Sequence, residues 1–267
     1  MIDSKDHLRL VWLGPIVDES TLAASPAVSP AANRWQQAVI QAINGQGGDV
    51  FIIGHLPEPV WPRGQLWINK SMASLPPNLN GSIAEYFNFP KLRNRSIAKG
   101  YHQAYDLYHA QHGNPTLLLA YNASPANDYL AQSIRKRHGI PWIAIVADDE
   151  APKAADGYVF LSWSYFTSFQ SDFKIHLDGG VSRLPSQIPM PKADYQPRVA
   201  LYSGAMNQYG GVELLVEAFH NVTRPGAELW LCGKGQNAAV NRAIAQDTRI
   251  KSLGFVSEEK LINLSKQ

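Results

Sequence analysis

The stretch that most constrains the fold runs from residue 198 to residue 267, and it opens with a strand, a turn and a helix. Residues 199–202 form a short apolar run, which predicts a parallel strand buried on both faces. Gly204, Gly210 and Gly211 then remove side chains where the chain has to turn sharply. Apolar residues follow at helical spacing and predict one buried helix face: Val212, Leu215, Val216 and Phe219.

The same order of elements recurs twice more. A second strand is predicted at 228–232, followed by Gly233-Lys234-Gly235 and a helix, and a third at 250–253, followed by Gly254 and a helix capped by Ser257. This alternation predicts a doubly wound α/β sheet whose glycine turns lie at the carboxyl ends of the strands, where open sheets bind ligands. Helix amino termini at that edge direct N–H groups at anions, so we expect a diphosphate there.

The preceding residues alternate in the same way, although less densely. A proline-rich segment, 184–197, predicts a linker between an N-terminal domain, 1–183, and a second domain, 198–267. We expect a long loop at 14–28 and at most one strand, 65–68, in the Pro- and Gly-rich stretch 55–90. Tyr101, Tyr105 and Tyr108 form a stripe that predicts core packing. The other expected elements are strands at 8–13, 49–53, 116–121, 141–146, 157–161 and 173–177, and helices at 29–45, 97–111 and 125–138.

Composition excludes several classes of protein. The 267 residues, 45% of them hydrophobic, can build one large or two ordinary domains. The net charge of +2 argues against a dedicated nucleic-acid binder, and the single cysteine, Cys232, excludes an internal disulfide. No apolar run reaches the length of a membrane span, and the polar amino terminus indicates no signal peptide, so we expect a cytoplasmic protein.

The order of residues in the second domain resembles a known family. Three runs, taken in order, are similar to the donor domain of retaining glycosyltransferases of family 4. They are Tyr-Ser-Gly…Gly-Gly-Val-Glu-Leu-Leu-Val-Glu-Ala-Phe, then Leu-Trp-Leu-Cys-Gly-Lys-Gly, then Ile-Lys-Ser-Leu-Gly-Phe-Val-Ser-Glu-Glu-Lys-Leu. The resemblance implies two Rossmann-like domains in the GT-B arrangement. It also implies transfer of a hexose from a nucleotide-diphosphate sugar to a glycan or lipid-linked acceptor, in cell-envelope polysaccharide synthesis. We expect no cofactor besides this co-substrate, no metal, no nucleic acid, and peripheral association with the inner face of the membrane.

The resemblance also implies which residues bind the donor. They are Gly204, Gly210, Gly211, Gly233, Lys234, Phe255 and Val256, the last two through backbone groups that read the base. The family usually places an Arg and a Lys around the first glycine turn, where this chain has Ala205 and Gly210. The diphosphate would then be held by backbone N–H groups of the Gly210-Gly211 turn or by Lys234, whose alternative role is that of an ordinary solvated lysine.

The catalytic candidates are Asp148 and Asp149, which follow a predicted strand. A carboxylate beside the acceptor hydroxyl can orient it or accept its proton, and the alternative is a loop pair that caps the next segment. Their adjacent spacing makes the two side chains diverge, so we do not expect a metal site. The resemblance also places other residues in the cleft, with a helix cap as the alternative for the serine at 162: Gly14, Ser29, Asn33, Asn122 and Ser162.

Three strands in the second domain are fewer than the roughly six of a complete Rossmann domain. We therefore expect this domain to be incomplete and to lack the family's paired glutamates that grip the donor. Two further hypotheses stay open: a truncated, catalytically inactive sugar-nucleotide or glycan binding module, and a nicotinamide-dependent Rossmann enzyme. The last is disfavoured because neither Gly14 nor Gly233-Lys234-Gly235 completes the dinucleotide-binding glycine pattern.

Overall fold

The computed structural model describes residues 8–122, 124–148, 151–152, 154–177, 198–207 and 210–265. The chain divides into two compact units, Met1–Leu184 and Pro185–Gln267, hereafter unit 1 and unit 2. The predicted linker at 184–197 and the predicted catalytic residue Asp149 lie outside the described residues.

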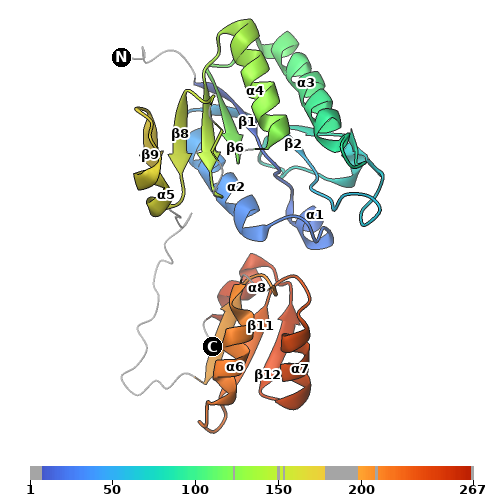
Figure 1. Ribbon diagram of the computed structural model, residues 1–267, viewed down its shortest axis with the longest axis vertical. Helices are drawn as coiled ribbons and strands as arrows, with labels where there is room; N and C mark the ends of the chain where they lie inside the picture. The colour runs from blue at the N-terminus through green and yellow to red at the C-terminus, as the bar shows by residue number, and fades with distance from the viewer. Residues whose placement is uncertain are drawn as a thin grey trace. The chain divides into compact units, whose positions relative to one another are not determined.

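Unit 1 is built around a seven-stranded parallel sheet with the order β4-β2-β1-β6-β7-β8-β9 (Figure 1). The chain winds outward from β1 to β2 and β4, and then outward in the other direction from β6. The topological switch point therefore lies between β1 and β6, where open α/β sheets bind ligands. The strands are β1 Arg9–Leu13, β2 Asp49–His55, β4 Asn80–Ala84, β6 Leu117–Tyr121, β7 Trp142–Val146, β8 Gly157–Phe160 and β9 Lys174–His176.

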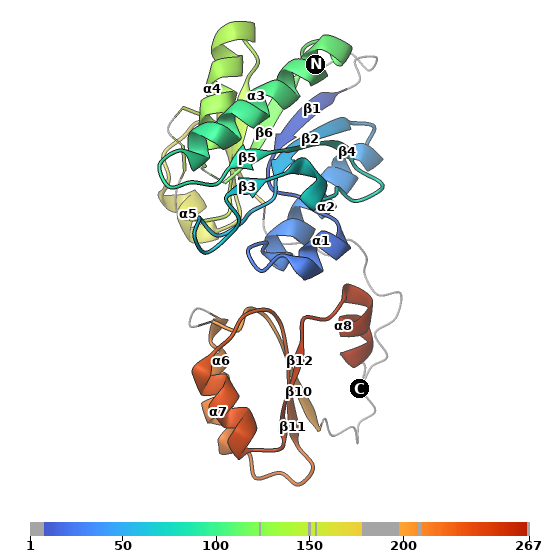
Figure 2. The same cartoon turned by 90° about the vertical axis from the view of Figure 1, so that its right-hand side faces the viewer.

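Helices cover both faces of this sheet, as Figures 1 and 2 show. Leu10 and Trp12 on one face of β1 share a core with Ile40 of α2, while α3 and α4 pack side by side over the other face. The tyrosine stripe of α3 is buried, which confirms the predicted core role of Tyr101, Tyr105 and Tyr108. The helices are α1 Glu19–Ala24, α2 Pro30–Gly45, α3 Arg93–His112, α4 Pro125–His138 and α5 Trp163–Ser168.

Two predictions for unit 1 were wrong. The expected loop at 14–28 contains α1, which begins where Thr21 N donates to the Asp18 side chain at 2.8 Å. The stretch 55–90 contains three strands rather than at most one: β4, with β3 Trp67–Ile68 and β5 Tyr86–Phe87 forming a small antiparallel sheet. A 3-10 helix, η1 Lys70–Met72, lies between β3 and β4. These elements are too short to show periodicity in the sequence.

Unit 2 is a three-stranded parallel sheet with the order β10-β11-β12. Helices α6 and α7 pack together on one face and α8 lies over the other (Figure 2). None of the helices in the described part of the chain is long and apolar enough to cross a membrane. The elements are β10 Val199–Ser203, α6 Val212–His220, β11 Glu228–Cys232, α7 Ala238–Gln246, β12 Ile250–Gly254 and α8 Glu258–Leu264.

The expectation that residues 199–202 are buried on both faces was wrong. Ala200 is exposed, and Val199, Leu201 and Tyr202 are half-buried. In the described part of unit 2, β10 pairs only with β11, whereas β11 has a neighbour on each side and buries Leu229 and Leu231 completely. Burial of a parallel strand depends on its neighbours, and the apolar run alone does not reveal them.

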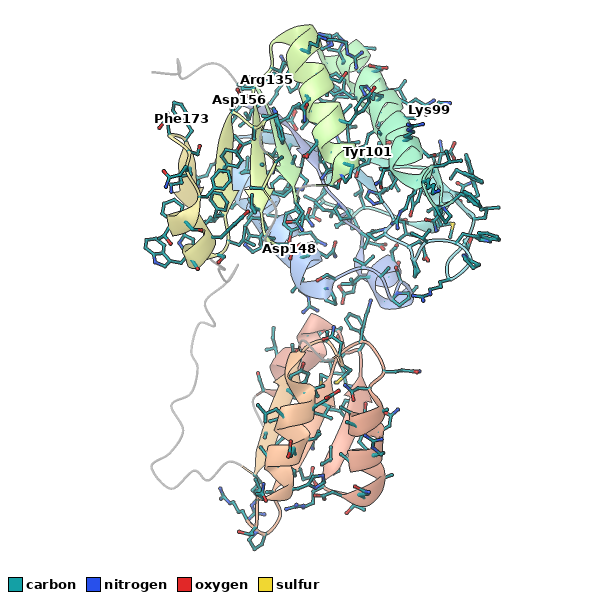
Figure 3. The ribbon with its side chains drawn as sticks, in the orientation of Figure 1. Lys99, Tyr101, Arg135, Asp148, Asp156 and Phe173 are labelled. Carbon is teal, nitrogen blue, oxygen red and sulfur yellow. The ribbon has the colours of Figure 1, made fainter. Side chains whose placement is uncertain are left out.

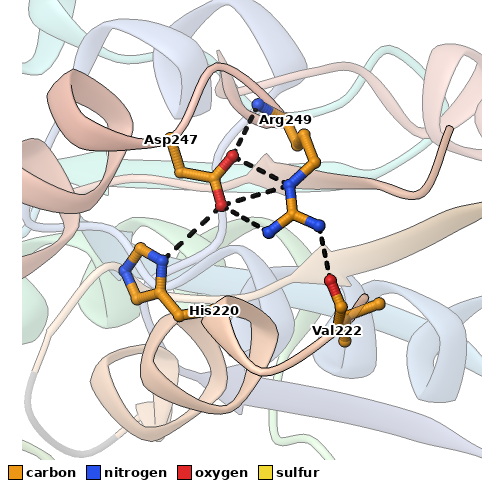
Figure 4. A network of polar contacts seen from close by, with 4 residues as sticks. All are labelled: His220, Val222, Asp247 and Arg249. Carbon is orange, nitrogen blue, oxygen red and sulfur yellow. Dashed lines mark hydrogen bonds and ion pairs between the residues drawn. The ribbon is translucent and has the colours of Figure 1, made fainter. Parts of the chain in front are cut away.

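The amino-terminal edge of the unit 2 sheet is fixed by an ion-pair network (Figure 4). Arg249 Nη2 lies 2.7 Å from Asp247 Oδ2, and Arg249 Nη1 donates to the Val222 carbonyl at 2.5 Å. His220 Nδ1 lies 3.5 Å from the same Asp247 oxygen. The hydrogen bonds from Arg249 lower the pKa of Asp247 to about 2. Charged side chains thus secure the end of the unit opposite its glycine turns.

Candidate functional site

Gly14 lies at the switch point of unit 1, directly after β1. Its N–H donates to the Ile53 carbonyl at 3.2 Å, which ties the turn to the end of β2. A Cβ on Gly14 would collide with the Gln36 side chain and would lie 2.9 Å from Trp12 Nε1 and 3.1 Å from Tyr121 Cβ. Glycine is therefore required here because β1, β6 and α2 meet at this point.

Two buried amides of α2 hold the loop that follows Gly14. Asn33 Oδ1 accepts from Val17 N at 2.9 Å, and Asn33 Nδ2 donates to Val17 O at 3.0 Å. Gln36 Oε1 accepts from Trp12 Nε1 at 3.0 Å. Asn33, which the sequence placed in the cleft, is buried and uses its amide to shape the loop. Gln36 was missed, although its place one turn after Asn33 puts both amides on one helix face.

Asn122 and Asp148 come together beside the switch point, at the carboxyl ends of β6 and β7. Asn122 Nδ2 donates to Asp148 Oδ2 at 2.7 Å, and Asn122 Oδ1 accepts from Ala147 N at 2.9 Å. Asp148 is exposed and its side chain lies at the lower edge of unit 1 in the view of Figure 3. Burial, with a smaller effect from Asp148, raises the pKa of Tyr121 to about 12. The arrangement offers one exposed, oriented carboxylate.

Ser29 and Ser162 both cap helices. Ser29 Oγ accepts from Ala32 N at 3.3 Å at the start of α2, and Ser162 Oγ accepts from Tyr165 N at 3.4 Å at the start of α5. Both serines are exposed. The capping role that sequence reasoning kept open for Ser162 is therefore present in the structure.

Two titratable side chains near this edge were missed. Asp128 lies in the first turn of α4, and burial raises its pKa to about 6. His55 ends β2, and its Nδ1 lies 2.7 Å from the Tyr101 hydroxyl. Burial and the Arg93 guanidinium lower the pKa of His55 to about 4, so its imidazole is neutral near pH 7. The predicted helix start at Ser124 could have placed Asp128 in a first helical turn. No local signal could have found His55, because its partners come from distant segments of the sequence.

In unit 2, the three glycine turns at the carboxyl edge are joined by backbone hydrogen bonds. Gly204 N donates to Cys232 O at 3.0 Å, Gly233 N to Gly254 O at 2.9 Å, and Met206 N to Lys234 O at 2.7 Å. A Cβ on Gly233 would collide with the Gly204 carbonyl. The N–H groups of Gly204 and Gly233 are thus used to hold the turns together.

The amino terminus of α6 differs from those of α7 and α8. Its N-cap is Gly211, with φ of 69° and no capping side chain among the described residues. The N-cap of α7 is Asn237, which accepts from Ala239 N at 2.9 Å, and that of α8 is Ser257, which accepts from Lys260 N at 3.4 Å. Because no described side chain occupies the first-turn N–H groups of α6, this helix start can accept an anion.

The other predicted donor residues lie around these turns. Lys234 Nζ lies 4.7 Å from the centre of the Phe255 ring, so these two side chains meet. Val256 is 8% exposed, and Gly210 N donates to Asn207 Oδ1 at 3.0 Å within its turn. Among the described residues, no three His, Cys, Asp or Glu side chains are grouped so that they could hold a metal ion.

Comparison with solved structures gives the fold. HepE from Anabaena in complex with UDP-glucose is similar over 94% of this chain and 70% of its own, with 13% identity and a TM-score of 0.55. An α-glucosyltransferase in complex with UDP-glucose and DNA containing an abasic site is similar over 98% of this chain and 71% of its own, with 11% identity and a TM-score of 0.52. No family model and no curated protein matches the sequence. The likeness shows an α/β fold with Rossmann-like units.

Proposed function

We propose that this chain is a retaining glycosyltransferase that moves a hexose from a nucleotide-diphosphate sugar to a glycan or lipid-linked acceptor. The observation that carries the proposal is the carboxyl edge of unit 2, where three glycine turns are joined by backbone hydrogen bonds and α6 begins with no side-chain cap among the described residues. A helix amino terminus favours a diphosphate. The similar HepE structure contains UDP-glucose, which supports a sugar nucleotide as the ligand.

The carboxyl edge of each sheet has a separate role in this proposal. The first turn of α6, beginning at Gly211, receives the diphosphate, and Lys234 and Phe255 lie beside the nucleoside. In unit 1, Asp148 orients the acceptor hydroxyl or accepts its proton, while Asn122 holds the carboxylate in place. Gly14 allows the close approach of β1, β6 and α2 beside this carboxylate. We further propose a role in cell-envelope polysaccharide synthesis, at the inner face of the membrane, without a metal ion.

The donor site can be tested with a matched pair of glycines. Gly211 and Gly226 both have left-handed φ angles, 69° and 73°, and a Cβ on either meets nothing closer than 3.9 Å. Gly211→Asp puts a carboxylate at the start of α6 and should weaken UDP and UDP-glucose binding about tenfold, measured by calorimetry. Gly226→Asp, in the turn before β11, is the control for the strain of placing Asp at a left-handed φ angle. Gly211→Asn is the control for the size and shape of the new side chain, because Asn has no charge.

Equal affinities for wild type and Gly211→Asp would contradict the donor site. Binding of NAD in place of every nucleotide sugar would favour the nicotinamide hypothesis instead. Turnover of UDP-, GDP- and ADP-hexoses with isolated envelope glycans and glycolipids as acceptors would then identify the reaction.

The second candidate is a sugar-nucleotide or glycan binding module without catalytic activity. Ala205 and Gly210 favour it, because they stand where the resembling family supplies the Arg and Lys that neutralise the leaving diphosphate. Nucleotide-sugar binding without transfer or donor hydrolysis would support this candidate. Loss of transfer in Asp148→Asn with unchanged UDP affinity would support the transferase.

A further inference from the structure

Four aromatic side chains gather where two loops of unit 1 meet, and we call Trp61, Trp67, Phe87 and Phe89 the aromatic cluster. Ring centres of neighbours lie 5.6 Å apart for Trp61 and Phe89, 5.9 Å for Phe87 and Phe89, and 6.4 Å for Trp67 and Phe87. Three of the rings are well exposed: Trp61 by 41%, Trp67 by 50% and Phe89 by 38%. Large aromatic side chains grouped at the surface mark an interaction site.

The aromatic cluster is held in place by one buried amide. Asn88 is completely buried, and its Nδ2 donates to Pro59 O at 2.7 Å and to Gln65 O at 2.8 Å. Its backbone N–H donates to Leu66 O at 2.7 Å, and its carbonyl accepts from Trp61 N at 3.2 Å. These four bonds join the two loops, so the exposed rings are presented by a fixed framework.

Aliphatic and basic side chains accompany the rings. Val60, Leu66 and Leu92 are 36%, 41% and 45% exposed. Arg63 follows Trp61 in one loop, and Lys91 follows Phe89 in the other; both are exposed. Residues 56–99 hold Arg63, Lys70, Lys91, Arg93, Arg95 and Lys99 against only Glu58 and Glu85. This segment of the sequence is basic, whereas the whole chain has a net charge of only +2.

We propose that the aromatic cluster and its basic neighbours dock this protein on an anionic lipid bilayer. Trp and other aromatic rings favour the interfacial layer of a membrane, and Lys and Arg near the surface are attracted to anionic lipids. A glycan partner fits less well, because exposed aliphatic side chains and a high positive charge do not improve stacking on neutral sugars. An anionic lipid surface interacts favourably with the aromatic, the aliphatic and the basic side chains.

The position of the surface connects it to the candidate site. One loop leaves the carboxyl end of β2 and the other leaves the carboxyl end of β4. These strands end at the same edge of the parallel sheet as Gly14 and Asn122. Docking through this surface would bring that edge to the bilayer, where a lipid-linked acceptor is presented. The inference thus deepens the proposed function and rests on it for the acceptor, whereas lipid binding itself requires no sugar transfer.

The test is flotation of the full chain with vesicles of phosphatidylcholine alone and of phosphatidylcholine with 30% phosphatidylglycerol. We expect binding to the anionic vesicles that weakens as salt is raised. Arg63→Glu/Lys91→Glu should lower the partition coefficient at least about tenfold, and Trp61→Ser/Trp67→Ser by roughly fivefold or more. Controls outside the surface are Lys136→Glu/Arg242→Glu and Trp163→Ser, the last an exposed tryptophan of α5.

Circular dichroism shows whether each variant is folded, and quenching of tryptophan fluorescence by brominated lipid gives a second measurement on the wild type. No binding to anionic vesicles at low salt would overturn the proposal, and so would equal losses in the control variants. Quenching by soluble oligosaccharide, without any binding to vesicles, would overturn it in favour of a glycan platform. UDP-glucose binding is measured in parallel, so failure of lipid binding and failure of the donor site can be told apart.

Discussion

The carboxyl edges of the two sheets are built in different ways. Unit 1 fixes its loops with side-chain amides, as Asn33 does with Val17 and Asn122 with Asp148. Unit 2 joins its glycine turns to one another with backbone groups that approach closely because Gly204 and Gly233 have no side chains. The Tyr202 hydroxyl adds bonds within one turn, to Ala205 O and Gly210 O. The difference teaches where each edge is vulnerable. The edge of unit 1 should weaken when side-chain hydrogen bonds are removed as well as when atoms are added at Gly14, whereas the edge of unit 2 should be most sensitive to atoms added at Gly233.

The largest effect is expected for Gly233→Ala. Its added methyl group would collide with the Gly204 carbonyl, so β10 and β11 must separate at their carboxyl ends. We expect a loss of about 3 kcal/mol in the unfolding free energy of unit 2. Hydrogen exchange of the β11 amides measures it without interference from unit 1.

The matched control is Gly211→Ala in the same unit. The Cβ would meet nothing within 4 Å, so only the strain of a φ of 69° remains, which costs about 1 kcal/mol. Similar losses for the two variants would show that close backbone contact does not fix this edge. Because even a methyl group disturbs Gly233, a bulky substitution there cannot serve as a test of nucleotide binding.

For the edge of unit 1, Asn33→Ala removes both bonds to Val17. It leaves the buried Val17 N–H without its acceptor, while Val17 O keeps the bond from Gln37 Nε2 at 3.1 Å. We expect a loss of about 2–3 kcal/mol, seen as faster hydrogen exchange at residues 14–18. Ser29→Ala, at the cap of the same helix, should cost about 1 kcal/mol. An Asn33→Ala protein with wild-type exchange in this loop would contradict the role of the amide.

The two edges also differ in how far the sequence predicted them. The glycine turns of unit 2 follow apolar strands directly, and β11 and β12 lie where these patterns predicted strands. The burial of β10 was predicted wrongly, because it depends on strand neighbours that a local run does not show. The roles predicted for the glycines in donor binding stay predictions.

In unit 1 the sequence indicated the strands and the larger helices but not the contacts that shape the loops. Asn33 was identified as a site residue, yet its bonds to Val17 depend on the path of an irregular segment. The stretch 55–90 could not be interpreted, because its order depends on Asn88, which joins two loops that are distant in sequence. Non-local polar contacts of this kind leave no periodic signal.

A smaller effect is expected at Asn122, whose amide is half-buried and whose φ is 58°. Asn122→Gly keeps the left-handed backbone accessible and removes only the bonds to Asp148 and Ala147. We expect a loss of about 1 kcal/mol in the stability of unit 1, together with weaker acceptor use if Asp148 is catalytic. Urea denaturation and transferase assays check both. Unchanged stability and turnover would remove Asn122 from the site.

The smallest effect concerns Asp128 and depends on pH. Its Oδ1 is buried with no hydrogen-bond partner in the described structure, and burial raises the pKa of Asp128 to about 6. Because this pKa is higher in the folded state, the carboxyl favours folding below pH ~4, and that contribution is lost as pH rises through about 6. Asp128→Asn removes the ionisable group, so the variant should gain stability relative to wild type above pH 6.

A shift of this size in a fully buried group would be equivalent to about 3 kcal/mol. Asp128 is only half-buried, so solvent screening reduces the expected gain to about 1 kcal/mol at pH 8. Urea denaturation at pH 4 and pH 8 measures the difference between variant and wild type. Asp106→Asn, at an exposed position of α3, is the control for the same substitution elsewhere in unit 1. If Asp128→Asn gained the same stability at both pH values, ionisation of the Asp128 carboxyl would not destabilise the fold. Asp128 would then have no role beyond its position in the first turn of α4.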